Sequence, residues 1–401
     1  MPSWKHPLGI NVLEAAQQRI SWTFDTFPKI CVSFSGGKDS TVMLHLVATE
    51  AKKRNRKFAV LFVDWEAQYK YTIDHVSEMF TLYEDLIIPF WISLPLKTVN
   101  AVSQFEPEWI SWEPDKESLW VRQPPSIAIT DPAMLPFYSY AMTFEEFVPS
   151  FLQWYSNGTP TASFVGIRTR ESLNRWRTIG AGKKHSYDNK CYTTVDKSVC
   201  NIFPIYDWTV DDIWTFHGRT NLPYNKLYDQ MARAGVPLHK MRICEPYGPE
   251  QRQGLWLFHA IEPDTWGKVV ARVNGANMGS IYANEKGNVL GINQIVLPTE
   301  HTWKSFATHL LDSMPTKTSE HYKNKIAVYL KWYQDKGITI PDTQPKDCGS
   351  SDNHPSWKRI CKTILRNDFW CRTLSFAPTK TSAYEKYLKL MKIRREKWDL
   401  I

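Results

Sequence analysis

The chain has 401 residues, of which 43% are hydrophobic and 22% are charged. This composition is that of a folded globular protein of one large domain or two smaller ones, and it excludes a disordered or fibrous chain. The first twenty residues lack the apolar stretch of a secretory signal, and no segment approaches the ~18 apolar residues of a membrane span. Since the seven cysteines are scattered, we expect reduced thiols in a cytoplasmic protein without membrane contact.

The excess positive charge lies in the C-terminal part of the chain. Residues 316–401 contain 18 Lys and Arg against 9 Asp and Glu, whereas the first 315 residues contain 31 against 32. An excess of this kind favours an acidic partner such as nucleic acid or an acidic protein. A solvated helix surface is the alternative explanation.

The first part of the chain predicts alternating helices and strands. Asn11 can cap a first helix, and apolar runs at 29–34, 58–65 and 86–94 predict buried strands, with a helix over 69–83. Strands of this apolar kind, separated by helices, indicate a mostly parallel sheet that is covered on both faces. The predicted fold class is therefore a doubly wound α/β fold.

The pattern then changes. Residues 95–160 are rich in proline and aromatic side chains and are interpreted as an insertion over one end of the sheet. A strand resumes at 161–167, and Thr209 with Asp212 predicts a capped helix. After Pro315 the sequence becomes mainly helical, with helices expected from Ser319 to near Gly337, from Ser356, and over 382–398. We therefore predict an α/β domain over 1–245, an accessory segment over 246–315 and a basic helical region over 316–401.

The stretch Ser35-Gly36-Gly37-Lys38-Asp39-Ser40 connects the first predicted strand to the next helix. A strand that runs through two glycines into a helix presents free N–H groups and the positive end of the helix to one point, which is a phosphate site. It is not the P-loop of common ATPases, because Val32 and Asp39 stand where that loop needs glycine and Ser or Thr. It is not the dinucleotide fingerprint G-x-G-x-x-G either.

This loop resembles the pyrophosphate-binding loop (PP-loop) of the adenine nucleotide α-hydrolase superfamily. The longer form, SGGKDSTVMLHL, is most similar to the branch that contains phosphoadenosine phosphosulfate (PAPS) reductases. Residues 166–175 (GIRTRESLNR) and 203–214 (FPIYDWTVDDIW) resemble two further segments of that branch. Stretches beyond residue 240 resemble a bacterial subgroup described as PAPS sulfotransferases, whose encoded partner is typically a ParB-like protein. The resemblance implies an adenine nucleotide as the ligand, either ATP or PAPS.

The resemblance also gives each residue of the loop a role. The backbone from Ser35 to Ser40 would hold phosphate, with the two serine hydroxyls as donors and Lys38 as a mobile counter-charge. Asp39 would hold Mg²⁺ or orient the loop through its backbone. Lys38, Asp39 and Arg168 are the residues expected to act in catalysis.

Two further positions are expected at the ends of strands. Asp64 follows the second strand, where open parallel sheets place ligand groups, although a strand-end cap is the alternative. The family usually has Asp-Thr-Gly where this chain has Asp64-Trp65-Glu66, so the shape of the adenosine pocket stays open.

Three arginines follow the strand at 161–167, and they could bind phosphate or sulfate oxygens. They are Arg168, Arg170 and Arg175. We expect at least one of them to be a helix-surface residue paired with Glu171. Arg168 is the preferred ligand because it lies closest to the end of the strand.

The cysteines depart from the reductase pattern. The Glu-Cys-Gly-x-His motif of PAPS reductases and the cysteine pairs of the adenylyl-sulfate branch are missing, so no iron–sulfur cluster is expected. Cys244, near Arg242, is the remaining candidate for a reactive thiol, with a buried inert cysteine as the alternative. Four residues could also be considered as zinc ligands, but their spacing is irregular: Cys348, His354, Cys361 and Cys371.

The basic end of the chain offers a separate candidate surface. In the helix predicted over 382–398, Lys386, Lys389, Arg394 and Arg395 lie largely off the apolar face. A stripe of this kind predicts weak, sequence-independent and salt-dependent binding of nucleic acid.

These observations favour an enzyme that acts at the α-phosphate of an adenine nucleotide, by ATP pyrophosphatase or adenylyl-transfer chemistry. The first alternative is a thiol-dependent PAPS reductase or sulfotransferase that uses Cys244. The second is a nucleotide-binding regulatory module that acts with a ParB-like partner on DNA.

Overall fold

A computed structural model describes residues 9–103, 106–180, 186–196, 199–243, 248, 254–277, 297–343, 355–365, 368 and 371–374. They belong to two compact units. The first unit is formed by Met1–Thr98, Ile110–Pro246 and Leu257–Arg272, and the second by Val99–Trp109, Tyr247–Trp256 and Val273–Ile401. Cys244 and the predicted helix 382–398, with its four basic residues, lie outside the described residues.

The strands are β1 (Lys29–Ser33), β2 (Phe58–Val63), β3 (Ile87–Ile92), β4 (Leu96–Val99), β5 (Glu108–Ile110), β6 (Met142–Thr143), β7 (Thr161–Val165), β8 (Thr193–Asp196) and β9 (Val199–Ile202). The α-helices are α1 (Val12–Thr26), α2 (Lys38–Lys53), α3 (Lys70–Leu82), α4 (Phe144–Ser156), α5 (Leu173–Gly180), α6 (Val210–Thr220), α7 (Leu227–Arg233), α8 (Leu255–Ile261), α9 (Pro263–Arg272), α11 (Trp303–Asp312), α12 (Thr316–Gln334) and α13 (Trp357–Leu365). Short 3-10 helices lie at Pro114–Leu119, Pro132–Met134, Tyr187–Asn189, Leu238–Lys240 and Arg372–Leu374.

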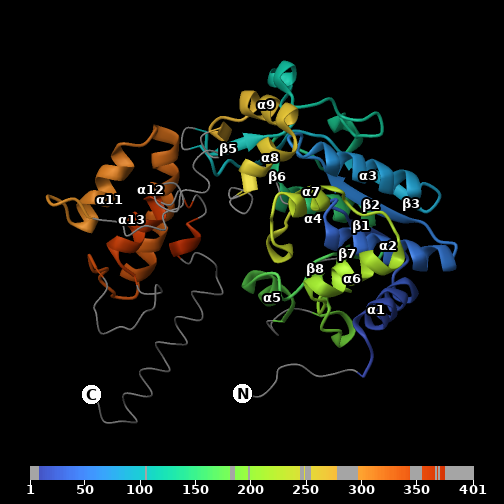
Figure 1. The fold of residues 1–401 in the computed structure, drawn as a ribbon. Helices are drawn as coiled ribbons and strands as arrows, with labels where there is room; N and C mark the ends of the chain where they lie inside the picture. The colour runs from blue at the N-terminus through green and yellow to red at the C-terminus, as the bar shows by residue number, and fades with distance from the viewer. Residues whose placement is uncertain are drawn as a thin grey trace, which may run out of the picture. The chain divides into compact units, whose positions relative to one another are not determined.

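The first unit is built on a six-stranded sheet with the strand order β3-β2-β1-β7-β9-β8 (Figure 1). The pairs β1–β2, β1–β7, β2–β3 and β7–β9 are parallel, and only β8 pairs with its neighbour in the antiparallel sense. The predicted mostly parallel α/β fold is therefore confirmed. The chain reverses its direction of travel through the sheet between β1 and β7, where doubly wound sheets open a crevice at the strand ends.

Both faces of this sheet are covered by helices, because successive side chains of a strand point to opposite faces. Val60 and Phe62 of β2 pack into a core with α1, α2, α3 and α6, whereas Ala59 and Leu61 pack against α4. The continuous apolar runs of the sequence are explained by this double burial, since all six residues of β2 are buried.

The ends of several helices follow from local sequence. The Asn11 side chain accepts a hydrogen bond from the Glu14 N–H at the start of α1, as expected. Thr209 and Asp212 form a reciprocal capping box at α6, which confirms that prediction. In the second unit, α12 begins at Thr316, slightly earlier than predicted, and α13 begins directly after Ser356.

The segment predicted as an insertion contains part of the main fold. Its residues Phe147 and Phe151, on α4, cover one face of the sheet together with Leu61. The proline at position 149 inside this helix and the aromatic composition concealed it in the sequence. The strands β8 and β9 were also missed, because each has only four residues.

The described part of the second unit contains a helical core. Tyr322 and Ile326 of α12 pack with Ile360 and Ile364 of α13 and with Ala307 of α11. The predicted helical character of the C-terminal region is confirmed for these residues. Within the described ranges, no helix is long and apolar enough to cross a membrane.

Candidate functional site

The predicted loop and the preferred arginine meet at the point where the sheet reverses. Gly36 and Gly37 follow β1, Arg168 follows β7, and these two strands are parallel neighbours with Ser33 opposite Val165. Carboxyl ends of adjacent parallel strands lie at the same edge of a sheet. The topology therefore brings together two motifs that lie 130 residues apart in the sequence, as the resemblance implied.

Two glycines are required by this geometry. Gly36 has φ +70°, and a Cβ atom there would lie 2.9 Å from the Thr72 side chain. At Gly166 a Cβ atom would lie 3.1 Å from the Cα of Ser40, in the backbone of the first turn of α2. A side chain at either position would push the loop away from its neighbours. These contacts fix the path of the backbone around the start of α2.

The start of α2 leaves backbone donors without partners in the helix. Gly37 is the N-cap residue, and the first bond inside the helix runs from the Thr41 N–H to the Gly37 carbonyl, at 2.9 Å. The N–H groups of Asp39 and Ser40 lie in the first turn and have no acceptor in the helix. The positive end of the helix dipole adds to their attraction for an anion. The Ser35 and Ser40 hydroxyls lie 3.0 Å from each other at this point.

Two buried cations converge on one carboxylate beside these donors. The Asp39 carboxylate pairs with Lys38 Nζ at 3.2 Å and with Arg168 Nε. The side chains of Lys38 and Arg168 are 6% and 3% exposed, whereas Asp39 retains 17%. The three groups together carry one net positive charge at neutral pH, since two cations face one carboxylate. Arg168 thus lies where the sequence placed it, at the loop.

The other two arginines lie apart from this group. Arg175 pairs with Glu171 at 3.7 Å and its side chain is 45% exposed, so it is the helix-surface residue that the sequence analysis expected among the three. Arg170 is exposed. Their part in nucleotide binding stays a prediction.

Three residues that sequence reasoning missed hold the loop from the segment around α6 and α7. Asn225 donates its amide to the Gly36 carbonyl at 3.0 Å, and the Tyr228 hydroxyl accepts the backbone N–H of Lys38 at 3.0 Å. His217 Nε2 lies 3.2 Å from the Lys38 carbonyl and donates to it, because a carbonyl can only accept. All three are buried, and only their proximity in the fold reveals them.

The histidines near the loop are neutral at physiological pH. Burial lowers the pKa of His217, with the hydrogen bond to the Lys38 carbonyl opposing the shift. Burial also lowers the pKa of His75 to about 3 and that of His45 to about 4. His75 bonds to the Thr41 hydroxyl at 3.0 Å, in the first turns of α2. These rings therefore support the helix start as uncharged groups.

Asp64 lies at the end of β2, as predicted, but its carboxylate is enclosed. It accepts hydrogen bonds from the Trp91 indole at 2.7 Å and from the Glu66 N–H at 3.0 Å, and it pairs with Arg122. Its side chain is 0% exposed. The bond to the N–H two residues on is the strand-end turn given as the alternative role. The part of Asp64 in nucleotide binding stays a prediction.

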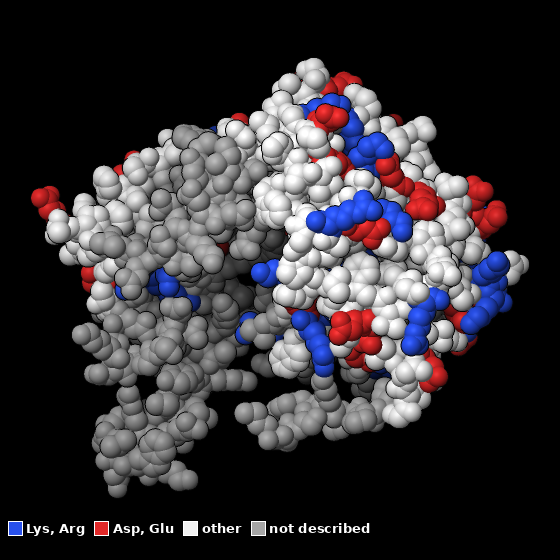
Figure 2. All heavy atoms as spheres, viewed as in Figure 1, with Lys and Arg blue, Asp and Glu red and all other residues white. Residues whose placement is uncertain are grey.

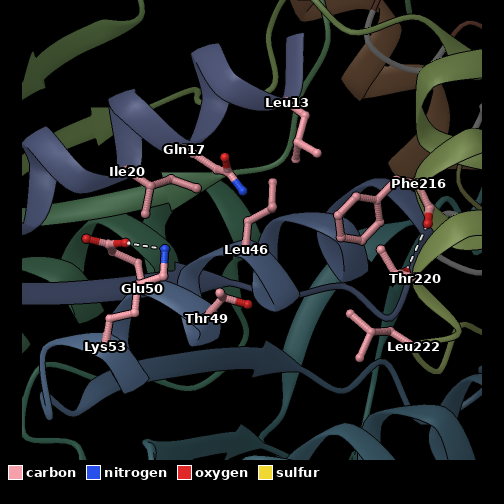
Figure 3. A pocket seen from close by; sticks show the side chains of 10 residues that line it. All are labelled: Leu13, Gln17, Ile20, Leu46, Thr49, Glu50, Lys53, Phe216, Thr220 and Leu222. Atoms are coloured by element: carbon pink, nitrogen blue, oxygen red, sulfur yellow. Dashed lines mark hydrogen bonds and ion pairs between the residues drawn. The ribbon is translucent and has the colours of Figure 1, made fainter. Parts of the chain in front are cut away.

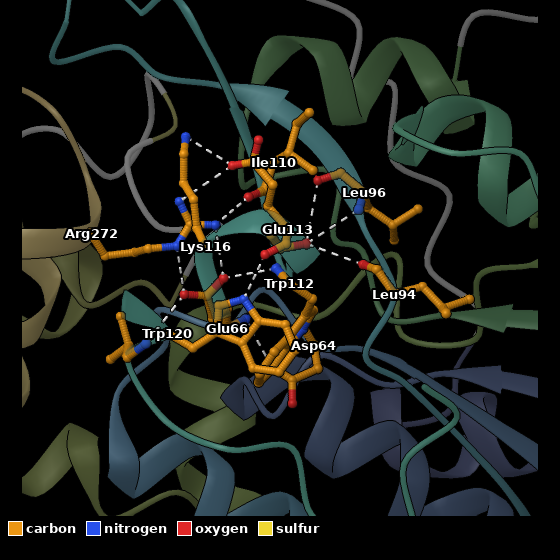
Figure 4. A network of polar contacts seen from close by, with 12 residues as sticks. Asp64, Glu66, Leu94, Leu96, Ile110, Trp112, Glu113, Lys116, Trp120 and Arg272 are labelled. Carbon is orange, nitrogen blue, oxygen red and sulfur yellow. Dashed lines mark hydrogen bonds and ion pairs between the residues drawn. The ribbon is translucent and has the colours of Figure 1, made fainter. Parts of the chain in front are cut away.

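Glu66 replaces the glycine that the resemblance implies at this position, and it adopts a backbone conformation that favours glycine. Its φ is +60°. Its carboxylate accepts from the N–H groups of Trp112 at 2.7 Å and Val121 at 3.2 Å, and from Arg272 Nε at 2.9 Å (Figure 4). Burial raises the pKa of the Glu66 carboxyl, and the charge of Arg272 opposes that shift. The residue that departs from the family pattern thus forms a buried ion pair with Arg272, which connects the end of α9 to the end of β2.

The described residues do not offer a ready magnesium site. Both oxygens of Asp39 already face a cation, and no group of three or more metal-ligating side chains occurs among the described residues. A third cation at Asp39 would therefore add to two that are already there. The role of Asp39 as a Mg²⁺ ligand does not fit this arrangement, and we assign no step to it.

The cysteines of the described part are mostly inert. Burial raises the pKa of the thiols of Cys31, Cys200, Cys361 and Cys371 to about 12, whereas Cys191 is exposed. Cys361 lies 3.0 Å from the Trp303 carbonyl inside the helical core. The other two candidate zinc ligands, Cys348 and His354, lie outside the described residues.

A cavity of about 200 Å³ lies elsewhere in the first unit (Figure 3). It is lined by α1, α2 and α6, with Leu46, Glu50 and Lys53 on the C-terminal half of α2. Glu50 is twelve residues after Lys38, or about 18 Å along the helix, so this cavity is separate from the loop.

On the face shown in Figure 2, basic and acidic side chains of the described residues are interspersed.

Two families of known proteins match parts of this chain. Residues 29–106 and 148–244 match the phosphoadenosine phosphosulfate reductase domain family, which leaves 107–147 as the intervening segment. Residues 235–352 and 343–385 match a domain of unknown function (DUF3440).

Relatives and solved structures were also found. Adenosine 5'-phosphosulfate reductase 2 of Bacillus subtilis is 24% identical over 243 residues, which cover 59% of this chain and 83% of that protein. The crystal structure of PAPS reductase from Candida auris is 17% identical, covers 54% of this chain and 84% of its own, and superposes with a TM-score of 0.32. Protein YbdN of Escherichia coli, described as uncharacterized, is 51% identical over 405 residues, which cover 100% of this chain and 99% of YbdN. The chain therefore belongs to the family of YbdN, and its residues match a PAPS reductase domain followed by a DUF3440 domain.

Proposed function

We propose that this protein binds an adenine nucleotide at the loop between β1 and α2 and transfers its adenylyl group, with release of pyrophosphate. The observation that carries the proposal is the convergence of Lys38 and Arg168 on Asp39 beside the free N–H groups of α2. Such a group matches a phosphate chain in charge and in hydrogen-bonding direction. The PAPS reductase domain match supports an adenine nucleotide as the ligand.

The residues would act by positioning and by charge. The acceptor attacks the α-phosphorus, the bond from that phosphorus to the bridging oxygen of pyrophosphate breaks, and the acceptor's proton passes to solvent. Lys38 and Arg168 would compensate the charge that develops on the leaving pyrophosphate. Mg²⁺ is proposed to arrive on the nucleotide's own phosphates, which is a common way for proteins to bind it.

Reduction of PAPS is the alternative that the family match favours, and the Bacillus subtilis relative is named as a reductase of the related adenosine 5'-phosphosulfate. It requires a thiol as reductant, and four of the described cysteines are poor nucleophiles because burial raises the pKa of their thiols to about 12. The remaining sources are the exposed Cys191, a cysteine of a partner protein, and Cys244 and Cys348, which lie outside the described residues. Arg242, expected to support a Cys244 thiolate, donates to the Glu171 carbonyl at 3.0 Å.

One experiment separates these functions. The full chain is incubated with ATP or PAPS, with and without nucleic acid, and pyrophosphate, sulfite and adenylylated products are measured. We expect pyrophosphate from ATP in the wild type, and its loss in Lys38→Met but not in Lys70→Met, an exposed lysine paired with Asp74 on α3. The reductase would replace the proposal if the wild type releases sulfite from PAPS but no pyrophosphate from ATP, and if Cys244→Ser abolishes the release of sulfite.

Two partners remain proposals: a ParB-like protein, which the resemblance implies, and nucleic acid, which the basic residues of the predicted C-terminal helix favour. Co-purification of the chain with a ParB-like protein would test the first. A filter-binding titration at low salt, with Lys386, Lys389, Arg394 and Arg395 changed to Glu, would test nucleic-acid binding by the basic helix. Binding that is unaffected by these four changes would contradict the second.

A further inference from the structure

Two of the phosphate-binding groups of the loop, the backbone N–H and the ammonium group of Lys38, already contact oxygen atoms of the protein itself. The Tyr228 hydroxyl accepts the backbone N–H of Lys38 at 3.0 Å, at the first residue of α2. The Met241 carbonyl accepts from Lys38 Nζ at 3.2 Å, and Asp39 Oδ2 also lies 3.2 Å from the same ammonium group. Each of these oxygens makes a contact that a phosphate oxygen would make at a helix start.

Tyr228 is held at this position from two sides. Its ring lies 5.4 Å from Lys38 Nζ in a cation–π contact, and the residue is 2% exposed. Asn225, three residues earlier, is anchored to the Gly36 carbonyl at 3.0 Å and to the Thr72 hydroxyl at 3.1 Å. The anchor fixes the start of α7, so release of Lys38 would require a movement of the Tyr228 side chain itself.

We infer that the Tyr228 hydroxyl is a built-in competitor for phosphate, which closes the nucleotide loop in the free protein and is displaced when the nucleotide binds. This inference rests on the proposed function, because it needs the loop to bind phosphate. A ligand that must displace an internal hydrogen bond binds only to the molecules in which the site is open. Its apparent affinity is the intrinsic affinity multiplied by the fraction of such molecules. The bond therefore lowers affinity for every phosphate-bearing ligand and leaves the adenosine part unaffected.

The test compares Tyr228→Phe with the wild type, by titration calorimetry with inorganic pyrophosphate, ATP and adenosine. Phenylalanine keeps the ring and removes only the hydroxyl. We expect Tyr228→Phe to bind pyrophosphate and ATP about three- to tenfold more tightly, the range given by the net strength of one hydrogen bond. Its affinity for adenosine should stay within twofold of the wild type.

The matched control is Tyr224→Phe. Tyr224 lies on the same segment, and its hydroxyl donates to Asp229 at 2.8 Å instead of contacting the loop. Its removal should leave all three affinities unchanged. The melting temperature of each variant without ligand reports whether it folds.

The outcomes distinguish this inference from the function on which it rests. Equal or weaker binding of pyrophosphate by Tyr228→Phe, with ATP bound by both proteins, would overturn the competitor role and leave the nucleotide site intact. Weaker binding would instead make the hydroxyl a donor to phosphate. If neither protein binds pyrophosphate or ATP, the proposed function fails, and the inference fails with it.

Discussion

Two buried clusters of arginine and carboxylate lie at the carboxyl ends of neighbouring strands, and they differ in how fully their charges are compensated. After β2, Glu66 accepts four hydrogen bonds, two of them from Arg272, and both side chains are 0% exposed. After β1, Asp39 faces the two cations Lys38 and Arg168 and keeps 17% of its side chain exposed. The first cluster is closed and neutral, whereas the second retains a positive charge beside a helix start.

This difference indicates which cluster stabilises the fold and which binds a ligand. A fully paired buried network leaves no donor or charge for a ligand, and removal of one partner leaves the other buried without compensation. A cluster with an excess cation and free N–H groups gains from an added anion. Substitutions in the two clusters should therefore differ in their effect on the free energy of unfolding.

The largest effect is expected at the closed cluster. Glu66→Ala removes the closer carboxylate partner of the buried Arg272 and leaves only Glu113, 3.8 Å from Arg272 Nη1, so it should lower the free energy of unfolding by about 3–5 kcal/mol. Chemical denaturation at pH 7 measures this change. The control is Asp74→Ala, which removes an exposed carboxylate paired with Lys70 and should change it by less than about 1 kcal/mol. A loss at Glu66 as small as the control would show that the cluster does not stabilise the fold.

A smaller effect is expected from pH at the histidines beneath the loop. The pKa values of His45 and His75 are lowered to about 4 and about 3 in the folded protein, so the unfolded chain binds more protons between these values and 6.5. Stability should therefore fall with acidification, by about 1 kcal/mol for each histidine between pH 7 and 5.5. Denaturation at both pH values, in the wild type and in His75→Gln, measures the difference. An equal pH dependence in the two proteins would contradict the neutral state of His75.

The comparison also shows which parts of the site the sequence could predict. The loop and Arg168 were predictable, because a contiguous motif and the end of a strand can both be recognised from local patterns in a single sequence. Asn225, His217 and Tyr228 were not, since they reach the loop through the packing of α6 and α7, and no spacing relates them to Lys38. The mostly parallel sheet, covered on both faces, was predictable from the apolar runs, whereas α4 was hidden by its proline and aromatic composition.

Glu66 is the most informative of these cases. The sequence showed only that glycine is missing where the family has it, and it left the shape of the adenosine pocket open. The structure retains the positive φ that glycine favours and uses the side chain for an ion pair with Arg272. A contact between residues 206 positions apart cannot be seen in local patterns.

This interpretation predicts a smaller difference between two variants of Glu66. Glycine and alanine both remove the carboxylate, so they differ in how well the backbone tolerates φ +60°. Glu66→Gly should be about 1 kcal/mol more stable than Glu66→Ala, because a Cβ atom is disfavoured in the left-handed region. At Asp74, within helix α3, the order should reverse, with glycine about 1 kcal/mol less stable than alanine. If the glycine and alanine variants have the same order of stability at both positions, the backbone conformation at Glu66 is not the cause of the difference.

The smallest effect on stability is expected at the open cluster, where the effect on binding is large. Lys38→Met removes the ammonium group and leaves Arg168 paired with Asp39, so the free energy of unfolding should change by less than about 1 kcal/mol. Replacement of Asp39 is a poorer test, because it would leave the buried Arg168 without its carboxylate. Pyrophosphate should bind about ten- to a hundredfold more weakly to Lys38→Met, the loss expected for a hydrogen bond to a charged group. Denaturation and calorimetry on the same preparation measure both quantities, with Lys70→Met as the control. A loss of several kcal/mol in stability with unchanged binding would place Lys38 in the same structural class as Glu66 and remove the physical basis for a nucleotide site at this loop.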